Sequence, residues 1–330
     1  MPRRSEFDLI ATLFAPLAQS HPGALNLTDD AALVRPSPGH EVVITTDTLI
    51  AGVHFRADDP PADVARKALR VNLSDLAAKG ARPVGVLQAL ALGYDTDDTF
   101  LQNYAYGLGD DLRRFDVPLL GGDTTAMPRG GPLTITITAL GEVPQGQALL
   151  RRGAQAGDLL CVSGTIGDAA LGLKALRGEL LSMAEPHRAA LARRYHLPEP
   201  RLALGQGLRE IATACLDISD GLCADVGHLC TASGVAAEIT WNAIPLSDPA
   251  REHLAVHPAD RALILGGGDD YELAFTIPPD RKSRALEVAA RAETSIAVIG
   301  HVGRGQAGSV RVIGDDGREI AVPVGGFVHR

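Results

Sequence analysis

Threonine alternates with isoleucine or alanine along residues 132–143 ("PLTITITALGEV"). This period of two predicts a strand with one buried face and one exposed face. Apolar runs at 41–50, 84–92 and 117–125 predict three further strands. In residues 5–20 the apolar positions instead recur every three or four residues, which predicts an amphipathic helix.

Longer segments of the first half predict helices. Residues 58–83 carry Pro60 and Pro61 near their start and "KGARP" at their end, which are typical helix boundaries. Residues 97–116 predict a second helix. For the second half the pattern predicts helices at 186–194, 201–213 and 280–292, strands at 236–241, 295–303 and 308–314, and a strand, glycine turn and helix across 159–176.

A stretch rich in Gly, Gln and Ala at residues 144–158 separates these two halves. Both halves mix helices and strands, so the chain predicts a mixed α/β (α+β) protein of two domains, residues 1–145 and 146–330. Both repeat the order strand, acid, helix. We therefore expect the two domains to face a common cleft.

Aspartates recur where we expect an apolar strand to finish, as in "VVITTDTL", "VPLLGGDT", "LDISDGL" and "LILGGGDDYELAF". One such residue is usually a helix cap or a turn former. Repetition weakens that interpretation, because carboxylates gathered in a cleft repel one another unless cations neutralise them. Oxygen donors without a His/Cys set favour Mg²⁺ or Mn²⁺. The candidate acids are Asp29, Asp30, Asp47, Asp75, Asp123, Asp217, Asp220, Asp269 and Asp270.

No known nucleotide-binding loop occurs in the chain: there is no Walker sequence, no kinase glycine-rich loop and no dinucleotide fingerprint. The glycine turns "LGGDTT", "SGTIGDA" and "LGGGDDYE" could bring backbone N–H groups to phosphate, or could be plain turns. Arg151 and Arg152 are candidate phosphate ligands or a solvated pair. His54, between Val53 and Phe55, is a packing residue or a substrate ligand.

The bulk composition limits the kinds of partner and the cellular location expected for the protein. Thirty-one basic and 40 acidic residues give a net charge of -9, which disfavours nucleic-acid binding. Four cysteines without metal-ligand spacing predict buried thiols in a reducing compartment. Glu6 and Asp8 interrupt the apolar N-terminal pattern, so no signal peptide is expected. No apolar run approaches a membrane span. We therefore expect a cytoplasmic protein.

Several motifs together resemble the thiamine-monophosphate kinase family, within the aminoimidazole-ribonucleotide synthetase-like superfamily. In chain order they are "DDAAL", "TTDTLIAGVHF", "VNLSDLAAKGARP", "GGDTT", "RRGAQAGD", "LDISDGL" and "GGGDDYEL", and they extend over nearly the whole chain. The resemblance implies γ-phosphoryl transfer from ATP to thiamine monophosphate, assisted by several Mg²⁺ ions. It also implies a homodimer in which the N-terminal domains share a barrel-like sheet.

The resemblance also implies roles for individual residues. The metal ligands would be Asp30, Thr45, Thr46, Asp47, Asp75, Asp123, Asp217 and Asp220. The ATP contacts would be Gly122, Asp123, Arg151 and Ser219. The thiamine phosphate would meet His54, Asp269 and Phe327, and the aromatic side chain near adenine would be Tyr104 or Tyr106.

The chain departs from the family pattern at two positions, Thr28 in place of a usual Gly and Asp269 in place of a common Glu. Two alternatives stay open: another ATP-dependent synthetase of the superfamily, and a sensor that binds Mg²⁺-ATP without turnover. A sensor would need no acceptor pocket, so His54 and Asp269 separate it from a kinase.

Overall fold

The fold is that of a computed structural model, described here for residues 5–321. Two compact units make up the chain. The first comprises Met1–Leu76 and Arg82–Gly146, and the second comprises Ala77–Ala81 and Gln147–Arg330. Within the described residues, no helix has both the length and the apolar character needed to cross a membrane.

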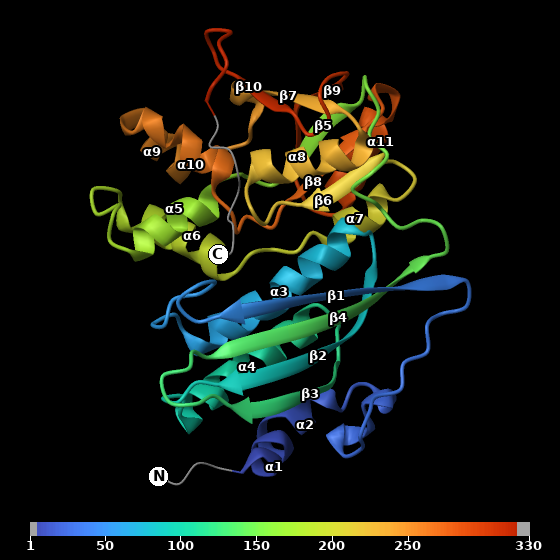
Figure 1. The fold of residues 1–330 in the computed structure, drawn as a ribbon, viewed down its shortest axis with the longest axis vertical. Helices are drawn as coiled ribbons and strands as arrows, with labels where there is room; N and C mark the ends of the chain where they lie inside the picture. Colours follow the sequence, from blue (N-terminus) through green and yellow to red (C-terminus); the bar gives the residue numbers. More distant parts are fainter. Residues whose placement is uncertain (1–4, 322–330) are drawn as a thin grey trace. The chain divides into compact units, whose positions relative to one another are not determined.

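The first unit contains a four-stranded sheet of order β1-β4-β2-β3 (Figure 1). Its strands are β1 (His40–Ile50), β2 (Arg82–Leu92), β3 (Leu119–Ala126) and β4 (Thr134–Pro144). Strands β2 and β3 run parallel, and the other neighbours are antiparallel. In β4, Ile135, Ile137 and Ala139 are buried while the threonines between them are half-buried, which confirms the predicted alternation.

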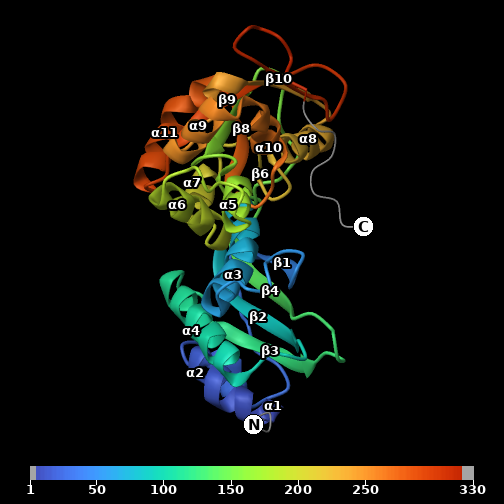
Figure 2. The ribbon, with the colours of Figure 1, turned by 90° about the vertical axis from the view of Figure 1, so that its left-hand side faces the viewer.

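Two helices, α3 (Pro61–Ala78) and α4 (Asp98–Arg114), cover one face of this sheet (Figure 2). The other face carries paired threonine hydroxyls, with Thr46 against Thr138 at 3.0 Å and Thr48 against Thr136 at 2.8 Å. A sheet with one covered face and one open face requires the period of two seen in the sequence of β4.

The predicted N-terminal helix is interrupted. It comprises α1 (Glu6–Leu9), a π-helical turn (Ile10–Phe14) and α2 (Ala15–Ala18), followed by a 3₁₀ turn (Pro22–Leu27). The π-helical turn ends two residues before Pro16, which has no N–H to continue the α-helical hydrogen bonds. Ala18 and Ala24 of this segment pack against Leu120 of β3.

The second unit contains a six-stranded sheet of order β10-β7-β9-β5-β8-β6 (Figure 1). Its strands are β5 (Leu159–Ser163), β6 (Ala214–Asp217), β7 (Ala236–Thr240), β8 (Leu273–Ile277), β9 (Ile296–Gly303) and β10 (Val310–Ile313). Its helices are α5 (Asp168–Leu176), α6 (Glu185–His196), α7 (Leu202–Leu208), α8 (Leu222–Ser233), α9 (Asp248–Val256), α10 (Arg261–Gly266) and α11 (Lys282–Arg291).

Separate apolar clusters lie on the two faces of this sheet. Leu160 and Val162 of β5 pack with residues of α5, α8 and α10, whereas Cys161 packs with α7 and α11. All four cysteines are buried and free, as predicted. Burial raises the pKa values of their thiols to between about 11 and about 12, so these groups stay protonated at neutral pH.

The prediction that each aspartate motif ends a strand is wrong for three of four motifs. Asp47 and Asp123 lie inside β1 and β3, and only Asp217 is the last residue of its strand. Before Asp269 the apolar residues belong to α10, and β8 begins after the acids at Leu273. A short apolar run beside glycine fits a buried strand or a buried helix equally well, and only its neighbours decide.

One predicted helix is shorter in the structure, because the helix expected at 201–213 ends at Leu208. Helix α9 was missed in the sequence.

Candidate active site

Thr45 and Asp47 of β1 meet a polar patch on α3. The Thr45 hydroxyl donates a hydrogen bond to the Asp75 carboxylate, and the Asp47 N–H donates to Asn72 Oδ1 at 3.0 Å. Asn72 is fully buried, and its side-chain N–H donates to the Ala68 carbonyl at 3.0 Å. Asp75 is half-buried in a stretch of α3 that is otherwise almost entirely buried. Asp75 therefore does not belong to a solvated helix face, and it holds a carboxylate beside β1.

Asp123 and Thr46 lie on the opposite face of the same sheet from Asp47. Asp123 of β3 pairs with Ala89 of β2, Ala89 pairs with Thr136 of β4, and Thr136 pairs with Thr48 of β1. Asp123 therefore shares a face with Thr48, the residue that follows Asp47 in β1. Successive residues of a strand point to opposite faces. The structure therefore separates these side chains, which the sequence had grouped together.

Gly122 has a structural reason to be glycine. A Cβ atom built there would lie 1.9 Å from the carbonyl oxygen of Gln88 on the neighbouring strand. Close backbone packing thus accounts for this glycine with or without a phosphate. Asp30 lies in an exposed bend after the 3₁₀ turn, where its N–H donates to Asp29 Oδ1 at 2.8 Å.

His54 closes a tight turn after β1. Its Nδ1 accepts the N–H of Ile50 at 3.0 Å, so a neutral ring carries its proton on Nε2. Lys67 Nζ donates to the His54 carbonyl at 3.1 Å, although the lysine side chain is 1% exposed. Sequence reasoning missed Lys67, because its spacing on α3 is that of an ordinary charged helix residue.

In the second unit, the loop after β6 brings together several predicted residues. Asp217 ends the strand, and the Ser219 carbonyl accepts the N–H of Asp269 at 2.9 Å. The N–H groups of Ser219, Asp220 and Gly221 all donate to Asp225 Oδ2 of α8, at 3.0, 3.0 and 3.1 Å. These amides therefore have a partner in the protein and are not available to a phosphate.

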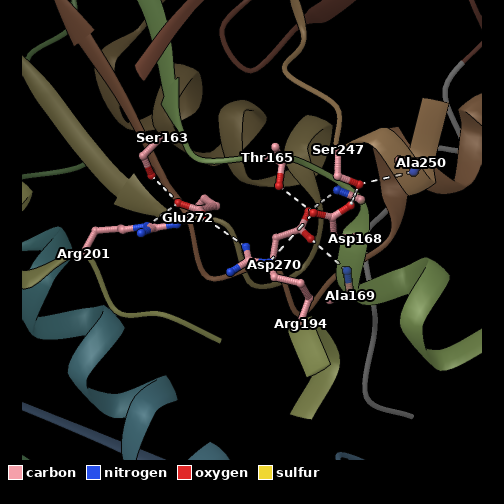
Figure 3. Close-up of polar contacts among 11 residues, drawn as sticks. Ser163, Thr165, Asp168, Ala169, Arg194, Arg201, Ser247, Ala250, Asp270 and Glu272 are labelled. Carbon is pink, nitrogen blue, oxygen red and sulfur yellow. Dashed lines mark hydrogen bonds and ion pairs between the residues drawn. The ribbon is translucent and has the colours of Figure 1, made fainter. Parts of the chain in front are cut away.

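Asp269 and Asp270 are sequence neighbours with different surroundings. Asp269 is half-buried, with a left-handed φ of 71°. Asp270 is 1% exposed and accepts the N–H groups of Gly167 and Ala169 at 2.6 and 3.3 Å (Figure 3). Two N–H groups of the "SGTIGDA" turn are thus bonded to Asp270, and those of Gly164 and Ile166 are bonded to the carbonyls of Ser295 and Pro245. Only Asp269 remains a candidate for contact with a substrate.

A buried ionic cluster that includes Asp270 and Glu272 was not predicted. Arg194 and Arg201 both donate to Glu272, at 2.8 and 2.6 Å, and Ser163 adds a third donor at 2.6 Å (Figure 3). Asp168 accepts the hydroxyls of Thr165 and Ser247, both at 2.5 Å. Burial raises the pKa of Asp270 to about 8, with Asp168 adding to the shift and the bound amides and Arg194 opposing it. With Asp270 protonated, the two remaining carboxylates, Asp168 and Glu272, match the two guanidinium groups of Arg194 and Arg201 in charge.

The remaining predicted residues are placed as follows. Arg151 is exposed, and its carbonyl accepts the Ser233 hydroxyl at 3.2 Å. Phe327 lies outside the described residues. Across residues 5–321, no group of three or more His, Cys, Asp or Glu side chains is close enough to hold a metal ion.

Known proteins resemble this chain over almost its full length. The family descriptions "AIR synthase related protein, N-terminal domain" and "AIR synthase related protein, C-terminal domain" match residues 28–143 and 155–313. The thiamine-monophosphate kinase of Caulobacter vibrioides is 43% identical over 98% of this chain and 91% of that protein.

Solved structures agree with the sequence relatives. The thiamine-monophosphate kinase of Stenotrophomonas maltophilia K279a is 41% identical, with a TM-score of 0.79 over 89% of this chain and 90% of that one. The complex of AaThiL with AMPPCP and TMP is 32% identical, with a TM-score of 0.76 over 90% of each chain. The fold and the motif series thus lead to one assignment: this chain is a member of the thiamine-monophosphate kinase family of AIR synthase related proteins.

Proposed function

We propose that the protein phosphorylates thiamine monophosphate with ATP, producing thiamine diphosphate and ADP. The observation that carries the proposal is the set of oxygen donors on β1 and α3, where the Thr45 hydroxyl donates to Asp75 and the Asp47 backbone N–H donates to Asn72. A relative bound to both AMPPCP, an analogue of ATP, and TMP supports the same pair of substrates.

The chemistry of these donors fits Mg²⁺. Carboxylate and hydroxyl oxygens are hard ligands, and Mg²⁺ usually binds through a few carboxylates together with substrate phosphates. Among residues 5–321 no three such side chains form a metal site by themselves, so substrate phosphates would supply the remaining ligands. The proposed ligands are Asp30, Thr45, Thr46, Asp47, Asp75, Asp123, Asp217 and Asp220. When bound, several Mg²⁺ ions would neutralise phosphate charge during transfer.

The transfer proposed here is direct and in line. A phosphate oxygen of thiamine monophosphate attacks the γ-phosphorus of ATP, the bond from that phosphorus to the β,γ-bridging oxygen breaks, and ADP leaves with the electron pair. Gly122, Asp123, Arg151 and Ser219 would contact ATP, and His54, Asp269 and Phe327 would contact the acceptor. The chain then mainly binds and orients two anions, and it needs no covalent nucleophile.

The proposal includes a homodimer formed through the first unit. The face of the sheet away from α3 and α4 exposes Val42 (44%), Ile44 (65%) and Leu87 (37%). Strand β1 is eleven residues long and lies at the edge of the sheet. A long edge strand beside exposed apolar side chains is typical of a surface that another chain covers. Asp47 and Asp123 lie apart within one chain. In a dimer, Asp123 of a second copy could share a metal site with Asp47 of the first.

The direct test is to incubate the purified protein with Mg²⁺-ATP and thiamine monophosphate and to quantify thiamine diphosphate and ADP by chromatography. We expect equal amounts of the two products, and loss of both in Asp47→Asn and Asp220→Asn. Glu41→Gln, at an exposed glutamate of the same strand, is the control that should keep activity. ATP binding without thiamine diphosphate would instead favour the sensor or another superfamily substrate.

A further inference from the structure

We propose that Asp225 is a positioning residue for the candidate metal and substrate ligands of the second unit. The inference rests on the proposed function, and it assigns a role to a residue that no motif singled out. Asp225 lies one turn into α8 and is 3% exposed. It acts through the backbone of the loop that precedes its own helix.

Three consecutive amides converge on one oxygen of this residue. The N–H groups of residues 219–221 point at Asp225 Oδ2, with no distance above 3.1 Å. Consecutive amides in this arrangement form a concave anion site, which in many proteins receives a phosphate. Here the acceptor is a carboxyl oxygen of the same chain, which fixes the conformation of the loop in the absence of ligand. Asp217 is the last residue of β6 just before this loop, and Asp220 is the middle residue of the three whose amides are held.

The fixed loop in turn holds the segment that carries Asp269. Asp269 N–H and Tyr271 N–H donate to the carbonyls of Ser219 and Ile218 at 2.9 and 2.8 Å. Both donors have left-handed φ values, 71° and 50°, which are uncommon for residues other than glycine. A change at Asp225 would therefore reach Asp269 through two backbone hydrogen bonds.

Glycines on each side of the loop show how closely these backbones pack. Gly221 has a φ of 119°, and a Cβ there would lie 2.8 Å from the backbone of Gly266. At Gly268 a Cβ would lie 2.3 Å from the Ser219 carbonyl oxygen. The loop thus has little freedom to adjust while its amides remain bound to Asp225. The glycines allow the backbones to pack closely, and Asp225 holds the loop through its three hydrogen bonds.

The test compares Asp225→Asn and Asp225→Ala with a matched control, Asp158→Asn. Asp158 is a buried carboxylate of the same unit, and it holds a different loop by accepting Gln155 N–H and the Thr213 hydroxyl at 2.9 and 2.6 Å. Thermal unfolding identifies the variants that keep a cooperative fold. Asn retains one acceptor oxygen, so we expect the Asn variant to fold and to show the smaller effect.

Two readouts decide the proposal. Hydrogen exchange at the amides of residues 219–221 should be at least about tenfold faster in Asp225→Asn than in the wild type and unchanged in Asp158→Asn. Mn²⁺ binding in the presence of AMPPCP should weaken by about 10–100-fold in Asp225→Asn only, as for residues that orient metal ligands. In the kinase assay, the concentrations of Mg²⁺ and of thiamine monophosphate that give half the maximal rate should both rise.

Other outcomes separate this inference from the proposed function. Unchanged exchange or unchanged Mn²⁺ affinity in Asp225→Asn, an equal change in Asp158→Asn, or a wild type that binds no Mn²⁺ overturns the positioning role. Weakened Mn²⁺ binding in a protein that forms no thiamine diphosphate keeps the positioning of a metal loop and overturns the kinase.

Discussion

Asp47 and Asp123 lie at opposite edges of the four-stranded sheet and on opposite faces of it. Asp47 pairs with Ile137, Ile137 with Gln88, and Gln88 with Gly122, so the register leads across all four strands to the residue before Asp123. Three strand spacings amount to about 14 Å. Two carboxylates of one chain at this separation cannot both bind the same Mg²⁺, which takes its ligands at about 2 Å.

This separation predicts complementation between inactive variants. If the active site combines Asp47 of one copy with Asp123 of the other, a mixed dimer of Asp47→Asn and Asp123→Asn contains one intact site and one doubly altered site. Random exchange of subunits should then restore about a quarter of wild-type activity. The measurement is thiamine diphosphate formation after the two variants are unfolded and refolded together.

The controls for complementation are the two variants refolded separately, which should stay inactive. If both carboxylates served one site within a chain, every site of the mixed dimer would carry one substitution, and mixing would restore nothing.

Asp270 should make the stability of the protein depend on pH. Burial raises its pKa from 3.8 to about 8, so the folded protein keeps a proton that the unfolded chain releases. Stability is greatest below pH 4 for this group and falls as the pH rises through about 8, by up to about 1.4 kcal/mol per pH unit. Urea unfolding at pH 5, 6, 7 and 8 should show a shallower slope for Asp270→Asn than for the wild type.

Asp269→Asn is the neighbouring control for this measurement: it removes the adjacent carboxylate and leaves Asp270 in place, so we expect it to keep the wild-type slope. Equal slopes for the wild type and Asp270→Asn would contradict the assignment of the proton to Asp270.

Glu142 should stabilise the first unit in the opposite pH range. Burial acts to raise its pKa, but hydrogen bonds from the Ser37 backbone, Arg82 and the Ser37 hydroxyl lower it to about 2. Its contribution is therefore present above pH 4.5 and is lost as the pH falls towards 2. Glu142→Gln should reduce the free energy of unfolding by about 1–3 kcal/mol at pH 7 and by less at pH 3. An equal loss at both pH values would show that charge is not responsible.

Substitutions of Tyr104 and Tyr106 should have different effects on stability and on the KM for ATP. Tyr104 is 1% exposed and donates to Gln88 Oε1 at 2.7 Å, whereas Tyr106 is 65% exposed. Tyr104→Phe should cost about 1 kcal/mol of stability and leave the KM for ATP unchanged. If one of the two contacts adenine, Tyr106→Ala should raise the KM for ATP with little loss of stability. A raised KM in Tyr104→Phe alone would reverse this assignment.

Local patterns were sufficient for most helices and strands of this chain. The threonine alternation in β4 and the proline-to-glycine limits of α3 act within a few residues, so they can be interpreted without knowledge of the fold. The motif series likewise identified the family, because each motif keeps its own residues together along the chain. The short run before Asp269 was misassigned, since its helical state depends on packing of Ile264 and Leu265 in the core of the second unit.

Relationships between distant segments depended on the tertiary structure. Strand register decides that Asp47 faces α3 and that Asp123 lies on the other face, and no pattern within either strand contains that information. Asp225 gains its role locally, from the shape of the turn that leads into α8. The pKa of Asp270 is raised by burial beside Asp168, which lies about a hundred residues earlier in the chain. Hydrophobic periodicity reports which side of an element is buried, whereas pairing and charge balance arise only when the elements are packed together.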